Sequence, residues 1–129
     1  MNKTVGCMLV FVLMFVAAPA FSAEVTQIWK CEMDDDASEA QVKAGAKAWF
    51  DAAKKIEGAA NFKAFVYFPI AVNATGEIDV WFVITAPSAA EWGKFWDNYG
   101  GSAAAAQEQE NASIVVCPDS AVWEVIKIE

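Results

Sequence analysis

The sequence contains no histidine and no arginine, and all nine of its basic residues are lysines. Without histidine, the chain has no Ser-His-Asp or Cys-His nucleophile pair, no imidazole acid or base, and no histidine ligand for zinc or haem iron. Without arginine, it has no bidentate clamp for a phosphate or a carboxylate. We therefore predict no catalytic residue, no metal site and no cofactor, and the composition favours a protein that is not an enzyme.

Long apolar runs are also few, and the main one lies at the start of the chain. Residues 1–23 have the pattern of a secretory signal peptide, with Lys3 before an apolar run and small residues up to Ala23. The apolar run from Val5 to Val16 is shorter than the roughly 20 residues that a membrane-spanning helix needs, which disfavours a membrane anchor. We expect an exported, periplasmic or secreted protein whose mature chain begins between Phe21 and Glu24 and forms one domain, 24–129.

Positive charge is scarce in the expected mature chain. Once Lys3 is removed, eight lysines and seventeen acidic residues remain, which gives a net charge of −9. Nucleic acids and anionic lipid surfaces bind basic protein faces, so this charge disfavours both as partners. We therefore expect no nucleic-acid partner and no membrane association after cleavage.

Cysteine is scarce too, because Cys7 belongs to the signal peptide and only Cys31 and Cys117 remain. An even pair in an oxidising compartment predicts a disulfide. The alternative, a metal site with two thiolates, lacks a histidine or a further cysteine to complete it. The sequence therefore favours a Cys31–Cys117 disulfide.

Hydrophobic periodicity predicts strands and helices in the order βαββαβ, which is the ferredoxin-like α+β plan: a four-stranded antiparallel sheet with helices on one face. That plan places the first strand antiparallel to the last and brings Cys31 near Cys117. Ser38 with Gln41, or Asp36 with Glu39, would cap the first helix. The predicted strands are 25–33, 62–72, 78–85 and 114–128, and the last contains a turn at 118–120. The predicted helices run from Ser38 to Gly58, from Ser88 to Gly100 and from Ser102 to about Asn111.

The two faces of the predicted 62–85 hairpin are both apolar, although helices can cover only one of them. The alternate residues that include Val66, Val80 and Ile84 should face the helices. We interpret the opposite face as a dimer contact, the lining of a ligand cavity, or ordinary core, in decreasing order of preference. The candidate residues on this face are Phe65, Tyr67 and Trp81, with Lys63 and Asp79 beside them.

Several smaller patterns have two readings each. Lys63 and Asp79 suit a surface ion pair better than an acid and base pair. The acidic run 34–36 suits a solvated helix start better than a calcium site. A stripe at helical spacing suits core packing better than a ligand site, and its members are Trp92, Phe95, Trp96 and Tyr99. Large residues occupy both alternations of the first and last strands, so their faces stay unassigned.

The βαββαβ order, the tryptophan-rich second helix and a sheet apolar on both faces resemble the dimeric α/β-barrel superfamily. The resemblance implies two sheets packed face to face in a homodimer that encloses a pocket. Members include small monooxygenases and stress-response proteins, and several enzymatic members use a histidine that this chain lacks. The leading hypothesis is a dimer that binds a small apolar or aromatic ligand. The alternatives are a cofactor-independent monooxygenase and a structural or interaction protein of the cell envelope.

Overall fold

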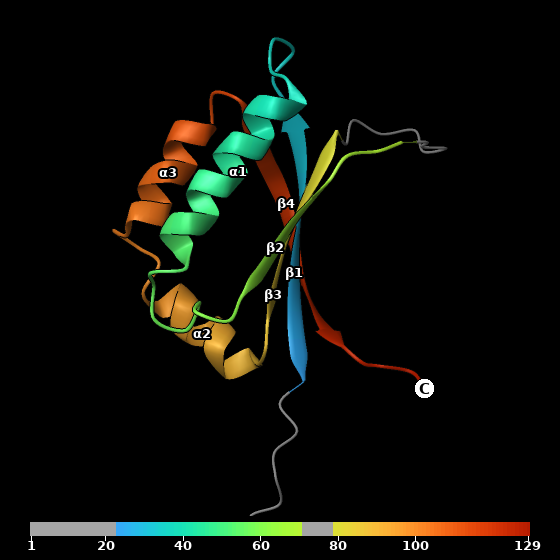
Figure 1. Ribbon diagram of the computed structural model, residues 1–129, viewed down its shortest axis with the longest axis vertical. Helices are drawn as coiled ribbons and strands as arrows, with labels where there is room; N and C mark the ends of the chain where they lie inside the picture. Colours follow the sequence, from blue (N-terminus) through green and yellow to red (C-terminus); the bar gives the residue numbers. More distant parts are fainter. Residues whose placement is uncertain (1–22, 71–78) are drawn as a thin grey trace, which may run out of the picture.

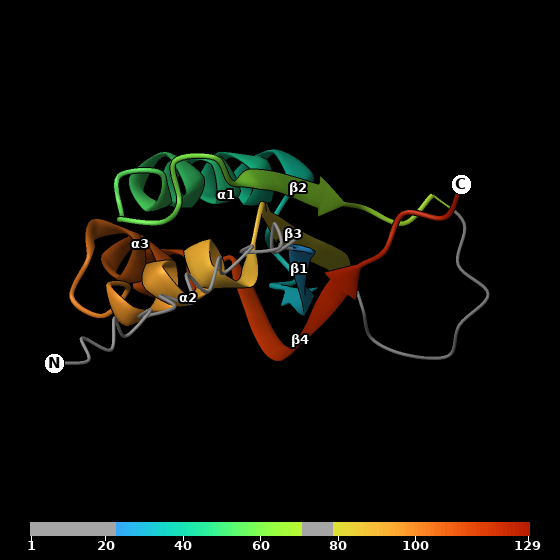
Figure 2. The same ribbon diagram turned by 90° about the horizontal axis from the view of Figure 1, so that it is seen from below.

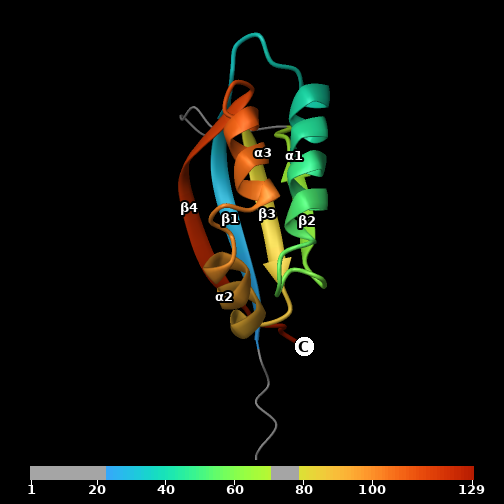
Figure 3. The same ribbon diagram turned by 90° about the vertical axis from the view of Figure 1, so that its left-hand side faces the viewer.

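The alternating segments of the chain form one antiparallel sheet. The computed structural model describes residues 23–70 and 79–129, so residues 1–22 of the expected signal peptide 1–23 and the expected turn at 73–76 lie outside the described residues. The strands are β1 (Glu24–Met33), β2 (Lys63–Tyr67), β3 (Val80–Ala86) and β4 (Val115–Val125). Their order in the sheet is β2-β3-β1-β4, which confirms the ferredoxin-like plan and the antiparallel pairing of the first and last strands (Figure 3).

Three helices lie on one face of this sheet, and none of the described helices covers the other face (Figures 1 and 2). They are α1 (Glu39–Ala53), α2 (Ala89–Asp97) and α3 (Ala103–Asn111). A serine side chain accepts a backbone N–H at the start of each helix, as expected for Ser38, Ser88 and Ser102. At α1 the capping box is the one with Gln41, whose Oε1 accepts the Ser38 N–H at 2.8 Å.

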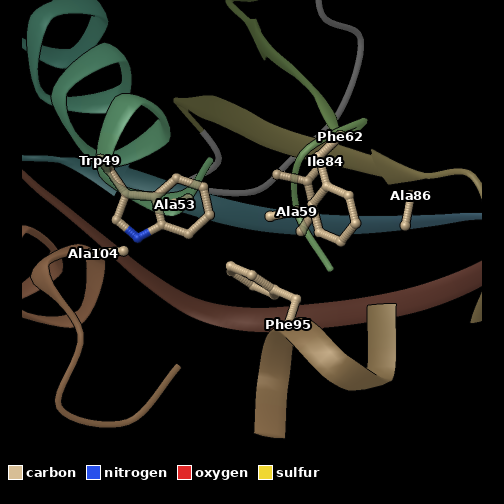
Figure 4. Packing of buried hydrophobic residues seen from close by; sticks show 8 residues of the cluster. All are labelled: Trp49, Ala53, Ala59, Phe62, Ile84, Ala86, Phe95 and Ala104. Carbon is tan, nitrogen blue, oxygen red and sulfur yellow. The ribbon is translucent and has the colours of Figure 1, made fainter. Parts of the chain in front are cut away.

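The main core lies between the helices and the middle of the sheet (Figure 4). Trp49 from α1 and Phe95 from α2 meet Ile84 of β3, and all three are buried. Gly58, which follows α1, has a φ of +96°, and a Cβ there would lie 2.5 Å from the carbonyl oxygen of Glu91. Glycine is therefore required where the chain passes close to α2.

Both edge strands were predicted too long, and the turn expected in the last one was wrong. β2 ends at Tyr67, two residues before Pro69, and Ile70 is fully exposed instead of facing the helices. β4 runs through Pro118 without the expected turn, because an extra residue in β4 shifts its register with β1 between Lys30 and Glu32. Pro69 lies just beyond one edge strand and Pro118 lies in the other, where a missing N–H costs no ladder hydrogen bond.

The structure also bears on the membrane question. Over residues 23–70 and 79–129, no helix is long and apolar enough to span a bilayer.

Candidate functional site

The uncovered sheet face carries a broad patch of large apolar side chains. Strand register aligns Phe65 with Val83 and Ile28, and Tyr67 with Trp81. Val83 at the centre is only 4% exposed because its neighbours cover it, whereas Trp81 on the same strand is 40% exposed. Phe65 and Tyr67 stack with their ring centroids 6.3 Å apart. We call Phe65, Tyr67, Trp81 and Trp123 the open-face patch; all four are exposed.

The structure assigns the faces of β1 and β4, which the sequence left open. Register pairs Thr26 with Trp123 and Thr85, and the Oγ1 atoms of Thr26 and Thr85 lie 3.2 Å apart. Ile28 and Trp123 therefore lie on the open face. Trp29 lies on the helix-covered face, where its ring contacts Phe82 and Trp96.

Lys63 and Asp79 do not form the expected ion pair. Lys63 is paired with Thr85 at one end of the hairpin, and Asp79 lies just beyond the other end of β3. Six residues of strand separate the two positions, which is about 20 Å. The Asp79 carboxylate instead accepts the backbone N–H of Met33 at 2.9 Å.

A disulfide joins Cys31 in β1 to Cys117 in β4, with the two Cα atoms 4.0 Å apart. Cys31 is buried on the helix-covered face. The bond closes β1 onto the edge strand next to the bulge that contains Pro118. Among the described residues, no group of three or more cysteine and acidic side chains is arranged to hold a metal ion.

A cavity of about 250 Å³ lies between the helices and the sheet, on the opposite side from the open-face patch. None of the five predicted face residues lines it. Its walls come from all three helices or the turns after them and from all four strands, and the disulfide forms part of one wall. The lining is aromatic and aliphatic except for Glu108 and Asn111 and the hydroxyl of Tyr99.

Five aromatic side chains of the lining contact one another in a closed circuit. The circuit runs from Trp29 to Phe82, Trp49, Tyr99, Trp96 and back to Trp29, with centroid separations from 4.7 to 6.3 Å. We call these five side chains the aromatic circuit. Tilted and edge-on pairs of this kind hold one another in place, so the cavity has a preformed wall.

Tyr99 connects the three helices at this cavity. Its hydroxyl accepts the indole N–H of Trp49 in α1 at 2.8 Å and donates to a carboxylate oxygen of Glu108 in α3 at 2.5 Å. Burial raises the pKa of Tyr99 far above its ordinary value, and Glu108 raises it further, while the Trp49 hydrogen bond acts in the opposite direction. The hydroxyl therefore stays protonated and keeps donating to Glu108 at neutral pH.

Two further polar side chains hold the lining in position. The Oε1 atom of buried Gln27 accepts the indole N–H groups of both Trp92 and Trp96, each at 3.0 Å. Asn111 donates to the Gly45 carbonyl of α1 at 3.0 Å. A Cβ at Gly45 would lie 2.7 Å from Asn111 Oδ1, so the absence of a side chain there leaves room for the Asn111 amide against α1.

Sequence reasoning found part of this site. It read the stripe at 92–99 as core, and Phe95 is fully buried as core, but Trp96 and Tyr99 of that stripe line the cavity. It did not single out Trp29, Glu108 or Asn111. The sequence contains no signal that sets Glu108 and Asn111 apart, because residues 107–111 of α3 are all polar.

Comparisons with known proteins support the fold. No protein-family model and no curated protein matches the chain. Among solved structures, SnoaB, a cofactor-independent oxygenase from Streptomyces nogalater, is 8% identical and aligns over 83% of this chain and 97% of its own, with a TM-score of 0.55. A dimeric ferredoxin-like protein of unknown function from Thermobifida fusca is 13% identical over 81% of this chain and 91% of its own, with a TM-score of 0.51.

A third similar structure is a longer protein, a candidate chlorite dismutase. It is 7% identical, with a TM-score of 0.51, and the match covers 81% of this chain but only 44% of that one. Sequence identities this low support a shared fold and nothing more. The chain therefore has the ferredoxin-like fold, which it shares with the dimeric protein from Thermobifida fusca.

Proposed function

We propose that this protein is an exported homodimer that binds a small molecule with an aromatic or apolar body in the cavity between its helices and its sheet. The observation that carries the proposal is the cavity of about 250 Å³ walled by the aromatic circuit. An apolar cavity of roughly 150 Å³ in another protein is large enough for benzene, so this one has room for a ligand of one or two rings. An apolar wall with few polar groups is the usual design of a binding site.

The homodimer is supported by the open-face patch and by the dimeric state of a similar structure. Helices cover only one face of the sheet, and exposure of aromatic side chains to water on the other face is unfavourable. A second copy of the same face, related by a two-fold axis, would cover them. In this arrangement the open-face patch forms the dimer contact and the ligand lies on the other side of the sheet, inside each subunit.

Titration followed by tryptophan fluorescence tests the binding proposal, because Trp29, Trp49 and Trp96 all line the cavity. Quinones, phenols and fatty acids form the first panel. We expect a saturable change with at least one of them. Trp81→Phe removes a tryptophan of the open-face patch, and a change that persists in this variant comes from the remaining tryptophans.

A cavity-filling variant gives the matching control. Ala46 lines the cavity, and Ala48 is exposed on the same helix. We expect Ala46→Leu to weaken binding at least about tenfold, because three added carbons occupy ligand space, and Ala48→Leu to leave it unchanged. Absence of any saturable change across the panel, or equal binding by both variants, would contradict the proposal and favour a structural or interaction protein.

A second candidate function is cofactor-independent oxygenation. It is supported by the similarity in fold to SnoaB over nearly the whole of that protein. In such a reaction the cavity would orient an electron-rich ring, and the substrate itself would supply the electrons to dioxygen. Oxygen consumption with each ligand that binds separates the two candidates: binding without consumption supports the first, and consumption that Ala46→Leu abolishes supports the second.

A further inference from the structure

The side chains that line the cavity carry formal charge of one sign only, which is negative. We propose that the cavity selects an organic cation, a protonated or quaternary amine attached to an aromatic or apolar body, and that Glu108 makes this selection. The inference rests on the proposed binding function and names the ligand class of the same cavity. It depends on the charge of the lining, on which donors are already used, and on the aromatic walls.

Charge is the first support. Among the described residues that line the cavity, Glu108 alone carries a formal charge, and no lysine reaches the wall. Glu108 is exposed to solvent as well as lining the cavity, so it lies where the cavity opens. Lysines elsewhere pack on other rings: Lys43 lies over Phe68 and Lys54 over Phe50. An anionic ligand would meet one carboxylate and no compensating cation, whereas a cationic ligand would meet an opposite charge.

Hydrogen-bonding capacity is the second support. The indole N–H of Trp49 donates to Tyr99, and the indole N–H of Trp96 donates to Gln27. The Tyr99 hydroxyl donates to one carboxylate oxygen of Glu108. Among the described residues, three of the four donors of the aromatic circuit are therefore used within the protein, and the indole N–H of Trp29 is not. The other carboxylate oxygen of Glu108 keeps its acceptor capacity. A ligand that brings a positive charge or an N–H group can therefore pair with Glu108, whereas a ligand that needs several donors finds only the Trp29 N–H in the circuit.

Orientation of the carboxylate is the third support. Tyr99 donates to Glu108 and is itself held by Trp49. Burial and the carboxylate together raise the pKa of Tyr99, so the donor persists at neutral and mildly alkaline pH. The acidic group is thus fixed beside aromatic rings instead of moving freely on the surface. A carboxylate fixed beside aromatic rings suits an organic cation, because the rings attract positive charge through their negative faces.

Three probes of nearly equal shape test the inference by titration of the full mature chain. Benzyltrimethylammonium is the cation, neopentylbenzene is its neutral carbon analogue, and phenylmethanesulfonate is the anion. We expect the dissociation constant of the cation to be at least about tenfold lower than that of the neutral analogue, and the anion to bind most weakly. The preference for the cation should shrink as salt is raised, because Glu108 is partly solvated.

Substitution identifies the group responsible. Glu108→Gln keeps an acceptor for Tyr99 and removes the charge, and we expect it to reduce the preference for the cation to about threefold or less. Glu110→Gln removes an exposed charge from the same helix outside the lining and should leave the preference unchanged. Glu108→Asp, which keeps the charge on a shorter side chain, should retain part of the preference.

The possible failures point to different conclusions. If neopentylbenzene binds as tightly as the cation, the cation inference is overturned while the proposed binding function stands. If Glu108→Gln and Glu110→Gln reduce the preference equally, the preference comes from the acidic surface as a whole and the inference is overturned. If none of the three probes and none of the first panel binds, both the inference and the proposed function are overturned.

Discussion

The indole N–H of Trp49 donates to the hydroxyl of Tyr99 at 2.8 Å, although the two residues lie fifty positions apart in the chain. The contact joins α1 to the turn after α2, and the onward hydrogen bond from Tyr99 to Glu108 adds α3. Trp49 is buried, so its N–H has little access to water. One hydroxyl therefore satisfies a core tryptophan and positions the carboxylate at the cavity.

Replacing this hydroxyl should destabilise the protein. Tyr99→Phe leaves the Trp49 N–H without its acceptor, and a buried unsatisfied donor costs about 1–3 kcal/mol. We expect the free energy of unfolding in urea to fall by that amount. Ser113→Ala, which removes an exposed hydroxyl outside the open-face patch and the cavity, should change it by less than about 0.5 kcal/mol. Equal effects of the two substitutions would contradict a structural role for the Tyr99 hydroxyl.

The raised pKa of Tyr99 predicts how the stability of the fold depends on pH. Because the pKa of Tyr99 is raised in the folded protein, the fold favours the protonated hydroxyl. Its contribution to stability is complete below the ordinary tyrosine pKa of about 10 and declines as the pH rises above that value. We expect the wild type to lose more stability than Tyr99→Phe between about pH 9 and pH 11. Parallel pH profiles of unfolding for the two proteins would refute this.

Gln27 should be important for stability because it is buried between two tryptophans. Its single Oε1 atom accepts the N–H groups of Trp92 and Trp96, and Gln27→Leu would leave both without that acceptor. We expect a loss of about 1–3 kcal/mol in the free energy of unfolding and a shift in tryptophan emission. Gln109→Leu on the exposed side of α3 serves as the control and should change stability by less than about 0.5 kcal/mol.

The Cys31–Cys117 bond should be present in exported protein purified without reductant. Its two cysteines are 86 positions apart, and loop-closure entropy for that length predicts a stabilisation of roughly 4–5 kcal/mol, against about 2–4 kcal/mol for a typical disulfide. Peptide mapping without reduction should recover the linked pair, and reduction should lower the urea midpoint. Free thiols at both positions in such a preparation would show that the bond does not form there.

Trp81→Lys should dissociate the proposed homodimer. Trp81 lies in the open-face patch, where a lysine on each subunit would place like charges in an apolar contact. Sedimentation at micromolar concentration should show a dissociation constant raised at least about tenfold. Ala48→Lys on α1 is the control for charge alone and should leave the dimer intact. A wild type that sediments as a monomer would rule out this assembly.

Export predicts a defined N-terminus. Mass spectrometry of the protein isolated from its source should find a mature chain that begins between Phe21 and Glu24, because the small residues suited to cleavage end at Ala23. A chain that retains Lys3 would contradict the signal-peptide interpretation and would raise the expected net charge by one.

Much of the fold follows from the sequence because local patterns set it. The serines before each helix offer a side-chain acceptor to backbone N–H groups that have no partner within the helix, so Ser38, Ser88 and Ser102 mark helix starts that the structure confirms. The βαββαβ order then leaves few arrangements, and the antiparallel pairing of β1 with β4 follows from it. The absence of histidine and arginine likewise limits the chemistry, because folding cannot supply a side chain that the chain lacks.

Tertiary structure alone decided which tryptophans face the cavity. Neighbouring residues such as Ile28 and Trp29 are both large and apolar, so alternation cannot tell which one points to the helices. Only the register of β1 between β3 and β4 decides it, and that register depends on contacts between residues far apart in the chain. The cavity itself is a gap left where α1, α3 and the sheet fail to meet, which is a property of packing in three dimensions and not of any one segment.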